Sequence, residues 1–194
     1  MRLNYIASAL SLILKDIGLV AFIPLITAIY YHDVNSFLPF IATGFIALFA
    51  GMLIRKFCKV STAADTLNDI KRSEALFIVT LSWVSFGFIA AIPYLFYGFS
   101  PINSLFEAVS GITTTGATIF TTYDYPKPLM FWRSFTQWLG GMGIIVLFVA
   151  ILPQFAVAGR QMFFAETPGP TEDKFTPRIK NTASALWIIY AGLT

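Results

Sequence analysis

Charged residues are scarce in this sequence, because aspartate, glutamate, lysine and arginine make up only 12% of its 194 residues. Soluble domains carry about twice that fraction, so an ordinary soluble domain is excluded. The share of hydrophobic residues, 57%, and the mean hydropathy of +0.73 agree with this. The composition therefore predicts an integral membrane protein.

Cysteine and histidine are almost absent, with one of each, Cys58 and His32. A single cysteine excludes an intramolecular disulfide and any cysteine-based metal cage. The sequence also offers no cluster of histidines or cysteines, no paired carboxylates on one face and no nucleophile with a base nearby. A membrane enzyme is thus only a remote alternative, and no cofactor is expected.

Two long stretches lack charged side chains altogether: 32 residues separate Glu74 from Glu107, and 26 separate Arg133 from Arg160. A spanning helix requires about 20 residues, so both stretches are long enough to cross a membrane. Together with the apolar N-terminal third, the pattern predicts an all-α fold. Its long helices are expected over residues 5–31, 37–54, 74–97 and 129–151, with a short surface helix in the polar loop 55–73.

Basic residues gather in two of the connecting segments. One holds Arg55, Lys56, Lys59, Lys71 and Arg72, the other holds Arg160, Lys174, Arg178 and Lys180, and only Lys127 and Arg133 fall on connections of the opposite side. The positive-inside rule then places the N-terminus and both basic loops in the cytoplasm. Despite a net charge of +3, this distribution indicates contact with membrane lipid and no nucleic-acid partner.

A run of hydroxyl and glycine residues lies between the third and fourth predicted spans. It reads Ser110-Gly111-Ile112-Thr113-Thr114-Thr115-Gly116-Ala117-Thr118. Threonine and glycine are poor helix formers, which favours extended backbone here. Irregular backbone at membrane depth is tolerated only where protein buries it or where it lines a water-filled path. Since backbone carbonyls in such a path can replace the water around K⁺, the run predicts an ion selectivity filter.

Residues that commonly begin a helix precede this run. A serine or asparagine in residues 100–104 can cap a helix, and residues 105–111 supply about two turns, roughly 10 Å at 1.5 Å per residue. That is too short for a hydrocarbon core of about 30 Å, so the chain must turn back inside the membrane. The carbonyl end of the short helix would then point inward, where its dipole favours a cation. Helix, re-entrant loop and helix form the pore unit of potassium channels.

Longer motifs resemble the Trk family of bacterial potassium uptake proteins. They lie at residues 113–118, 131–133, 137–147, 166–170, 176–179 and 185–187. Together they cover nearly the whole chain, and they are similar to the N-terminal portion of the TrkH/TrkG-type membrane subunit.

The resemblance implies two extra N-terminal helices followed by four linked pore units around one ion path. It implies that backbone oxygens of Thr114 and Thr115 bind K⁺, the transported ion, with Thr113 and Gly116 flanking them. It also implies a homodimer of the full-length subunit, a cytosolic nucleotide-binding regulatory partner of the TrkA type, and a place in the bacterial inner membrane.

Three parts of the chain follow from this interpretation. Residues 1–73 form the N-terminal transmembrane helix pair and a cytoplasmic loop. Residues 74–158 form the first pore unit, with pore helix and filter at 100–120, and residues 159–194 form a cytoplasmic loop and the start of a second unit. The chain is then expected to be an N-terminal fragment with one of four filter segments. A one-pore-unit cation channel subunit assembling as a homotetramer is the alternative.

Two charged residues flank the predicted filter. Glu107 could tune the electrostatic field of the pore, or it could have a hydrogen-bonded structural role or lie near the outer surface. Arg133 could pair with Asp124, but we expect its side chain to reach outward to the membrane surface instead.

Overall fold

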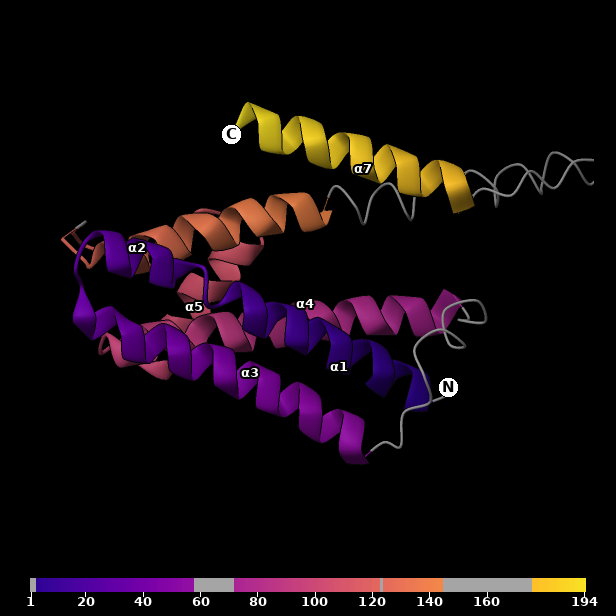
Figure 1. The fold of residues 1–194 in the computed structure, drawn as a ribbon, viewed down its shortest axis with the longest axis horizontal. Coiled ribbons are helices and arrows are strands. Elements are labelled where there is room, and N and C mark those ends of the chain that lie inside the picture. The colour runs from indigo at the N-terminus through magenta and orange to yellow at the C-terminus, as the bar shows by residue number, and fades with distance from the viewer. Residues whose placement is uncertain (1–2, 58–71, 123, 145–175) are drawn as a thin grey trace, which may run out of the picture. The chain divides into compact units, whose positions relative to one another are not determined.

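A computed structural model describes residues 3–57, 72–122, 124–144 and 176–194, and in these ranges every regular element is a helix (Figure 1). The chain forms two compact units, Met1–Gln137 and Trp138–Thr194. Three helical stretches within the described ranges are long and apolar enough to cross a membrane, namely Ile6–Tyr30, Val34–Phe57 and Ser73–Phe96. The prediction of an all-α membrane protein is therefore confirmed.

The first span is broken, which the sequence analysis did not predict. Helix α1 covers Leu3–Val20 and helix α2 covers Pro24–Tyr30, with three turn residues between them. Pro24 has no N–H to donate to the carbonyl of Val20. Ile23 N donates to that carbonyl instead, at 3.1 Å, in the tighter pattern of a 3₁₀ turn. The single helix predicted over residues 5–31 is thus wrong at this point.

The second and third spans agree with their predictions. A 3₁₀ turn η1, Val34–Ser36, leads into helix α3, Phe37–Phe57, and helix α4 covers Arg72–Phe96. Predicted limits of 37–54 and 74–97 differ from these by three residues or fewer. His32 is exposed in the turn before η1. The surface helix predicted in the loop 55–73 lies almost entirely outside the described residues.

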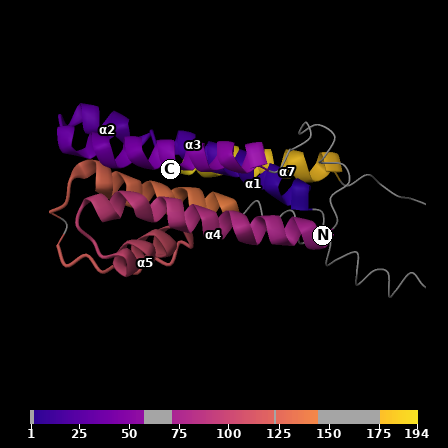
Figure 2. The ribbon, with the colours of Figure 1, turned by 90° about the horizontal axis from the view of Figure 1, so that it is seen from below.

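Helices α1, α3 and α4 lie side by side and contact one another (Figures 1 and 2). Glycine brings the backbones of α1 and α3 close together. A Cβ atom on Gly18 would lie 2.9 Å from Leu48 Cγ and 3.0 Å from the carbonyl oxygen of Gly44. A Cβ on Gly51 would lie 2.9 Å from the carbonyl oxygen of Ser11. Packing of this kind through small residues is typical of membrane helices, which cannot rely on water to drive them together.

Helix α5 covers Pro101–Ile112 and is longer than predicted. Its N-cap is Ser100, whose Oγ accepts a hydrogen bond from Asn103 N at 3.3 Å, so the predicted serine cap is confirmed and the helix starts directly after it. Twelve residues give about 18 Å, still short of a membrane span. The helix also includes Ser110 and Gly111, as the two turns expected over residues 105–111 predict, although the hydroxyl and glycine run that begins at Ser110 favoured extended backbone. Both are buried, and burial against neighbouring helices overrides their weak helix propensity.

A further helix starts at residue 127 and is described to residue 144. The span predicted over 129–151 therefore lies partly outside the described residues. Trp132, on this helix, is fully buried, and its indole Nε1 donates to the carbonyl oxygen of Ala90 in α4 at 3.1 Å. Its ring also meets that of Phe40 in α3, with 5.9 Å between the centroids.

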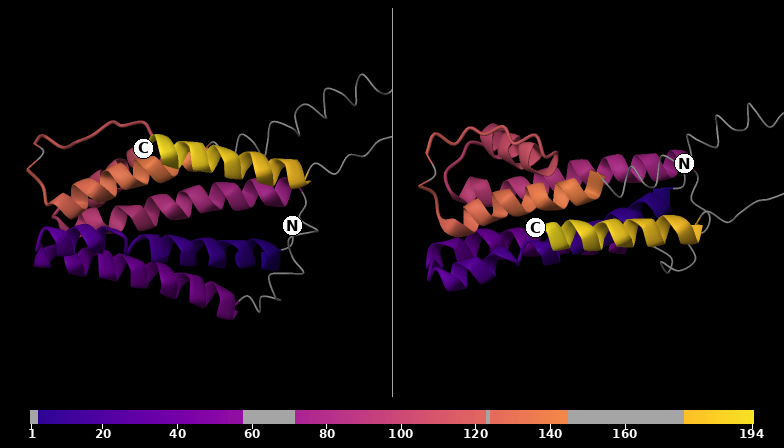
Figure 3. Two further views of the ribbon diagram at one scale, coloured as in Figure 1. Left: turned by 45° about the horizontal axis from the view of Figure 1, so that its top comes forward. Right: turned by 90° about the horizontal axis from the view of Figure 1, so that it is seen from above.

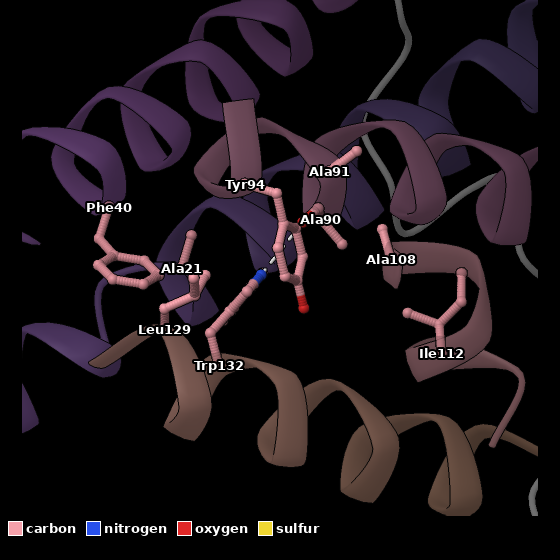
Figure 4. Packing of buried hydrophobic residues seen from close by; sticks show 9 residues of the cluster. All are labelled: Ala21, Phe40, Ala90, Ala91, Tyr94, Ala108, Ile112, Leu129 and Trp132. Atoms are coloured by element: carbon pink, nitrogen blue, oxygen red, sulfur yellow. Dashed lines mark hydrogen bonds between the residues drawn. The ribbon is translucent and has the colours of Figure 1, made fainter. Parts of the chain in front are cut away.

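A core of apolar side chains joins the turn after α1 to α3, α4, α5 and the first part of this last helix (Figure 4). Its buried members are Ala21, Phe40, Ala90, Ala91, Tyr94, Ala108, Ile112, Leu129 and Trp132. Four of these nine are alanine, so the helices approach closely around a few large aromatic rings. This core holds α5 in place from one side.

In the second unit, helix α7 covers Thr176–Leu193. Trp138 packs against it, with its ring centroid 6.2 Å from that of Trp187 and 5.8 Å from that of Tyr190. The apolar part of α7, Ser184–Leu193, is shorter than a membrane span.

Candidate functional site

The chain runs inward along α5 and then returns toward the end of the helices from which α5 started (Figures 2 and 3). The return is made by residues 113–120, which we call the return segment. Its residues 115–120 have no regular secondary structure. Of the predicted run, residues 113–118 are therefore outside the helix and 110–112 are inside it.

Two residues of the return segment have left-handed backbone. The φ angle of Gly116 is 75° and that of Thr114 is 58°. A Cβ on Gly116 would meet nothing within 4 Å, so the position favours glycine for its backbone conformation and not for lack of space. Thr114 is β-branched, and positive φ is a genuine outlier for such a residue. Backbone strain of this kind is concentrated at functional sites.

Ser110 holds the return segment against the end of α5. Its carbonyl oxygen accepts a hydrogen bond from Thr115 N at 3.1 Å, and its Oγ donates to the carbonyl oxygen of Ala117 at 2.5 Å. The carbonyl oxygen of Gly111 accepts from Thr114 N at 2.9 Å. These bonds pin the amide groups of the turn and so fix the path of its backbone.

The carbonyl oxygens of Thr114 and Thr115 remain available for a ligand. Within the described ranges neither accepts a hydrogen bond, whereas the carbonyl oxygen of Thr113 accepts one from Thr114 Oγ1 at 2.7 Å. Residues 113–118 are all exposed. Neutral carbonyl oxygens on a pinned backbone can replace the hydration shell of a monovalent cation.

Glu107 lies behind the return segment with its side chain fully buried. Its Oε1 accepts hydrogen bonds from Thr118 Oγ1 and from Ile119 N, both at 2.6 Å. Its Oε2 accepts one from Arg133 Nε at 3.1 Å, which makes a salt bridge. Of the roles considered for Glu107, the hydrogen-bonded one is confirmed.

Arg133 connects the carboxylate of Glu107 to the return segment. Besides the bond from Nε to Glu107, its Nη2 donates to the carbonyl oxygen of Gly116 at 3.2 Å. Its guanidinium also lies 5.8 Å from the centroid of the Phe120 ring. The expected outward orientation and the alternative pairing with Asp124 are both wrong. The rule that charges within a membrane protein pair with one another could have indicated Glu107 as the partner.

Aromatic rings border the far end of the return segment. Phe120 lies 4.5 Å from Tyr125 and 5.3 Å from Phe99, centroid to centroid, and Phe99 lies 6.0 Å from Tyr94. These rings come from α4, from the connection after it, and from both sides of residue 123. They anchor the return segment beyond Gly116, so its middle part is held between this cluster and Ser110.

Acidic, histidine and cysteine side chains do not gather into a metal site in the parts of the chain that the structure describes. In the described ranges, the return segment offers neutral oxygen atoms only, from its backbone carbonyls and its threonine hydroxyls.

Comparison with known proteins identifies a family. Residues 41–194 match the TrkH family, described as cation transport protein. The chain is 39% identical to the Trk system potassium uptake protein TrkH of Vibrio parahaemolyticus over 199 residues, covering 100% of this chain and 40% of that protein. It is 40% identical to the TrkH protein of Escherichia coli strain K12 over 181 residues, covering 89% of this chain and 35% of that protein.

The fold has a solved counterpart as well. The crystal structure of the potassium transporter TrkH from Vibrio parahaemolyticus superposes with a TM-score of 0.80 at 34% identity, covering 100% of this chain and 38% of that one. The chain therefore spans about 40% or less of the length of these relatives. The resemblance inferred from the sequence motifs is confirmed.

Proposed function

This chain belongs to the TrkH family of cation transport proteins, and from that premise we propose that it takes part in K⁺ uptake across the bacterial inner membrane, within the ion-conducting subunit of a Trk-type system. The family is one of transport proteins and not of enzymes. The two relatives described above are named as potassium uptake proteins, which supports K⁺ as the ion.

In this proposal residues 74–158 form a pore unit in which α5 is the pore helix and the return segment is one of four filter strands. The backbone oxygens of Thr114 and Thr115 bind K⁺, with Thr113 and Gly116 flanking them. The observation that carries the proposal is that Thr114 and Thr115 are exposed and that their carbonyl oxygens accept no hydrogen bond in the described ranges, while Thr114 and Gly116 have left-handed backbone.

The outward face of α5 supports an assembly of several pore units. Ile102 is 81% exposed, and Phe106 and Val109 are also exposed. With Leu105 and Ala117 they border an apolar hollow of about 350 Å³ beside Thr113 and Thr115. Further pore units packed on this face would bury it and would bring their own strands to the same ion path.

The remaining parts of the proposal follow from the family and from the charge distribution. The N-terminus and the basic loops face the cytoplasm, residues 1–73 form the helix pair with its loop, and residues 159–194 begin a second unit. The full-length subunit is a homodimer that works with a cytosolic TrkA-type regulatory subunit.

The test compares Gly116→Ser with Gly98→Ser in the full-length subunit, expressed in a bacterium that lacks its own K⁺ uptake. Gly98 is a matched control, since its φ is 85° and a Cβ there would also meet nothing within 4 Å, but it lies before α5. Both variants strain a left-handed residue equally. We expect Gly116→Ser alone to weaken K⁺ affinity or to admit more Na⁺, measured as flux normalised to protein amount.

Two results would contradict the proposal. Unchanged ion affinity and selectivity in Gly116→Ser would remove the filter assignment from the return segment. Rescue of growth at limiting K⁺ by residues 1–194 alone, with a tetrameric mass, would favour the one-pore-unit homotetramer instead.

A further inference from the structure

We propose that Glu107 and Arg133 are positioning residues that set ion specificity, by holding the return segment from behind as one buried ion pair. This inference rests on the proposed function, because it assigns these residues to the same ion path. Neither side chain supplies an oxygen to the ion. They act through the carbonyl of Gly116 and the backbone of residues 118–119.

Several hydrogen bonds meet at the ion pair of Glu107 and Arg133. The carboxylate of Glu107 accepts hydrogen bonds from Thr118 Oγ1, Ile119 N and Arg133 Nε. Two of these three donors belong to the return segment. Since Glu107 is fully buried and the Arg133 side chain is only 14% exposed, these charged hydrogen bonds are shielded from water and strong.

Arg133 also sets the direction of the Gly116 carbonyl group. Arg133 Nη2 donates to the carbonyl oxygen of Gly116 while Nε of the same guanidinium is bound to Glu107. This fixes the orientation of the peptide group that follows Gly116, which a residue without a Cβ would otherwise leave freer to rotate. The adjacent positive charge also makes the Gly116 oxygen a poorer cation ligand than the oxygens of Thr114 and Thr115.

This arrangement requires arginine and glutamate and not merely a pair of opposite charges. The planar fork of arginine presents several N–H groups in fixed directions, so it can bond two acceptors at once. Lysine keeps the charge, but it carries a single nitrogen and cannot reproduce that geometry. Glutamine in place of Glu107 would turn an amide donor toward another donor.

Packing of the helix that carries Arg133 does not depend on the ion pair. The helix that carries Arg133 is already attached to its neighbours without the ion pair. Trp132 Nε1 bonds the carbonyl oxygen of Ala90 in α4, and the side chain of Thr136 packs against Gly111 in α5. Loss of the ion pair is therefore expected to change the return segment more than the helix bundle.

The main experiment uses Arg133→Lys in the full-length subunit, with Trp132→Phe as the matched control. Trp132 is the preceding residue on the same helix, and its replacement removes one buried hydrogen bond that does not reach the return segment. We measure the KM for K⁺ and the ratio of K⁺ to Na⁺ flux, both normalised to protein amount. Arg133→Lys should shift one of them by on the order of tenfold, as expected for the loss of a charged hydrogen bond. Trp132→Phe should leave both within about twofold and lower only the protein amount.

A second variant serves if Arg133→Lys is poorly expressed. Thr118→Val removes one donor to Glu107 from an exposed position, together with the acceptor of Phe120 N, and leaves the ion pair intact. It should shift the flux ratio or the KM in the same direction as Arg133→Lys, but by less. Wild-type values in Thr118→Val and Arg133→Lys would overturn the inference.

A charge exchange distinguishes positioning from a plain ion pair. The double variant Glu107→Arg with Arg133→Glu can restore attraction between the helices, but it reverses the donors and acceptors that face the return segment. We expect protein amount to recover while the flux ratio stays abnormal, and recovery of both would overturn the inference.

If Arg133→Lys behaves as wild type while Gly116→Ser does not, the inference fails and the proposed function stands. If Gly116→Ser also behaves as wild type, the proposed function itself fails.

Discussion

The α1–α3 contact and the return segment both depend on glycine, but for opposite reasons. Between α1 and α3, Gly18 has ordinary helical backbone, and a Cβ there would lie within 3.0 Å of the neighbouring helix. In the return segment, Gly116 has open space around it and a φ of 75°. The first glycine is required by its neighbours, and the second by its own backbone.

This difference predicts different consequences of substitution in the two regions. Crowded glycines tolerate no side chain because backbone atoms of another helix are in the way, and a substitution there separates the helices. A left-handed glycine tolerates a side chain at the cost of a changed backbone angle. Its substitution should therefore alter the direction of nearby carbonyl groups with little effect on how the helices pack.

The largest effect is expected for Gly18→Val, which tests the close approach of α1 and α3. The new side chain would meet the backbone of α3, which cannot move aside as a flexible side chain can. We expect a loss of about 3 kcal/mol in unfolding free energy, measured by thermal unfolding in detergent. Leu19→Ala, at the next and exposed position, is the control and should change it by less than about 0.5 kcal/mol. Equal losses in both variants would show that α1 and α3 do not meet through Gly18.

A smaller effect is expected for Gly111→Ala, which lies between the two regions. A Cβ there would lie 2.7 Å from Thr136 Oγ1, the end of a side chain that can rotate. Overpacking costs about 1 to 3 kcal/mol, and the better helix propensity of alanine returns up to about 1 kcal/mol. We expect a net loss of about 1 kcal/mol in the same unfolding assay. Adding Thr136→Ala should remove most of that loss, and a double variant as unstable as the sum of the two single ones would argue against the contact.

The smallest effect on stability is expected for Thr114→Gly, which tests the role of positive φ in the return segment. Glycine relieves the cost of positive φ at this residue, about 1 kcal/mol or more, but it loses the bond from Thr114 Oγ1 to the carbonyl of Thr113 and makes the unfolded chain more flexible. The two effects should cancel to within about 0.5 kcal/mol. K⁺ affinity, measured as the KM for uptake, should weaken because the backbone near the ion is less rigid. Thr114→Asn, which tolerates the left-handed region, should keep an affinity closer to wild type.

Much of the fold could be predicted from the sequence because the membrane imposes simple rules. Helices α3 and α4 follow from apolar length, and the start of α5 follows from the capping chemistry of Ser100. The break before Pro24 was missed although its signal was present, since apolar length outweighed the missing N–H. For Ser110 and Gly111 the sequence supported two answers, because the helix start predicted two turns over residues 105–111 while the weak propensities of serine and glycine favoured extended backbone. Both residues are buried within α5, which decides for the helix.

In the candidate site, too, some features could be predicted from the local sequence and others could not. Composition and local residue types were enough to single out Gly116 and the threonines before it, because positive φ and free backbone oxygens are properties of the segment itself. The partner of Arg133 was not predictable from local sequence. Glu107 is 26 residues away, and only the packing of α5 against the following helix brings the two together.

By itself the sequence determined that the chain lies in a membrane, where its long helices run, and which short segment between them is too rich in threonine and glycine to continue a helix. These are consequences of hydrophobic length and of what each residue allows its own backbone to do. Only the tertiary structure decided which charges pair and which peptide group they hold. Such pairs form between atoms that the fold brings within about 3 Å, and no local pattern encodes that distance.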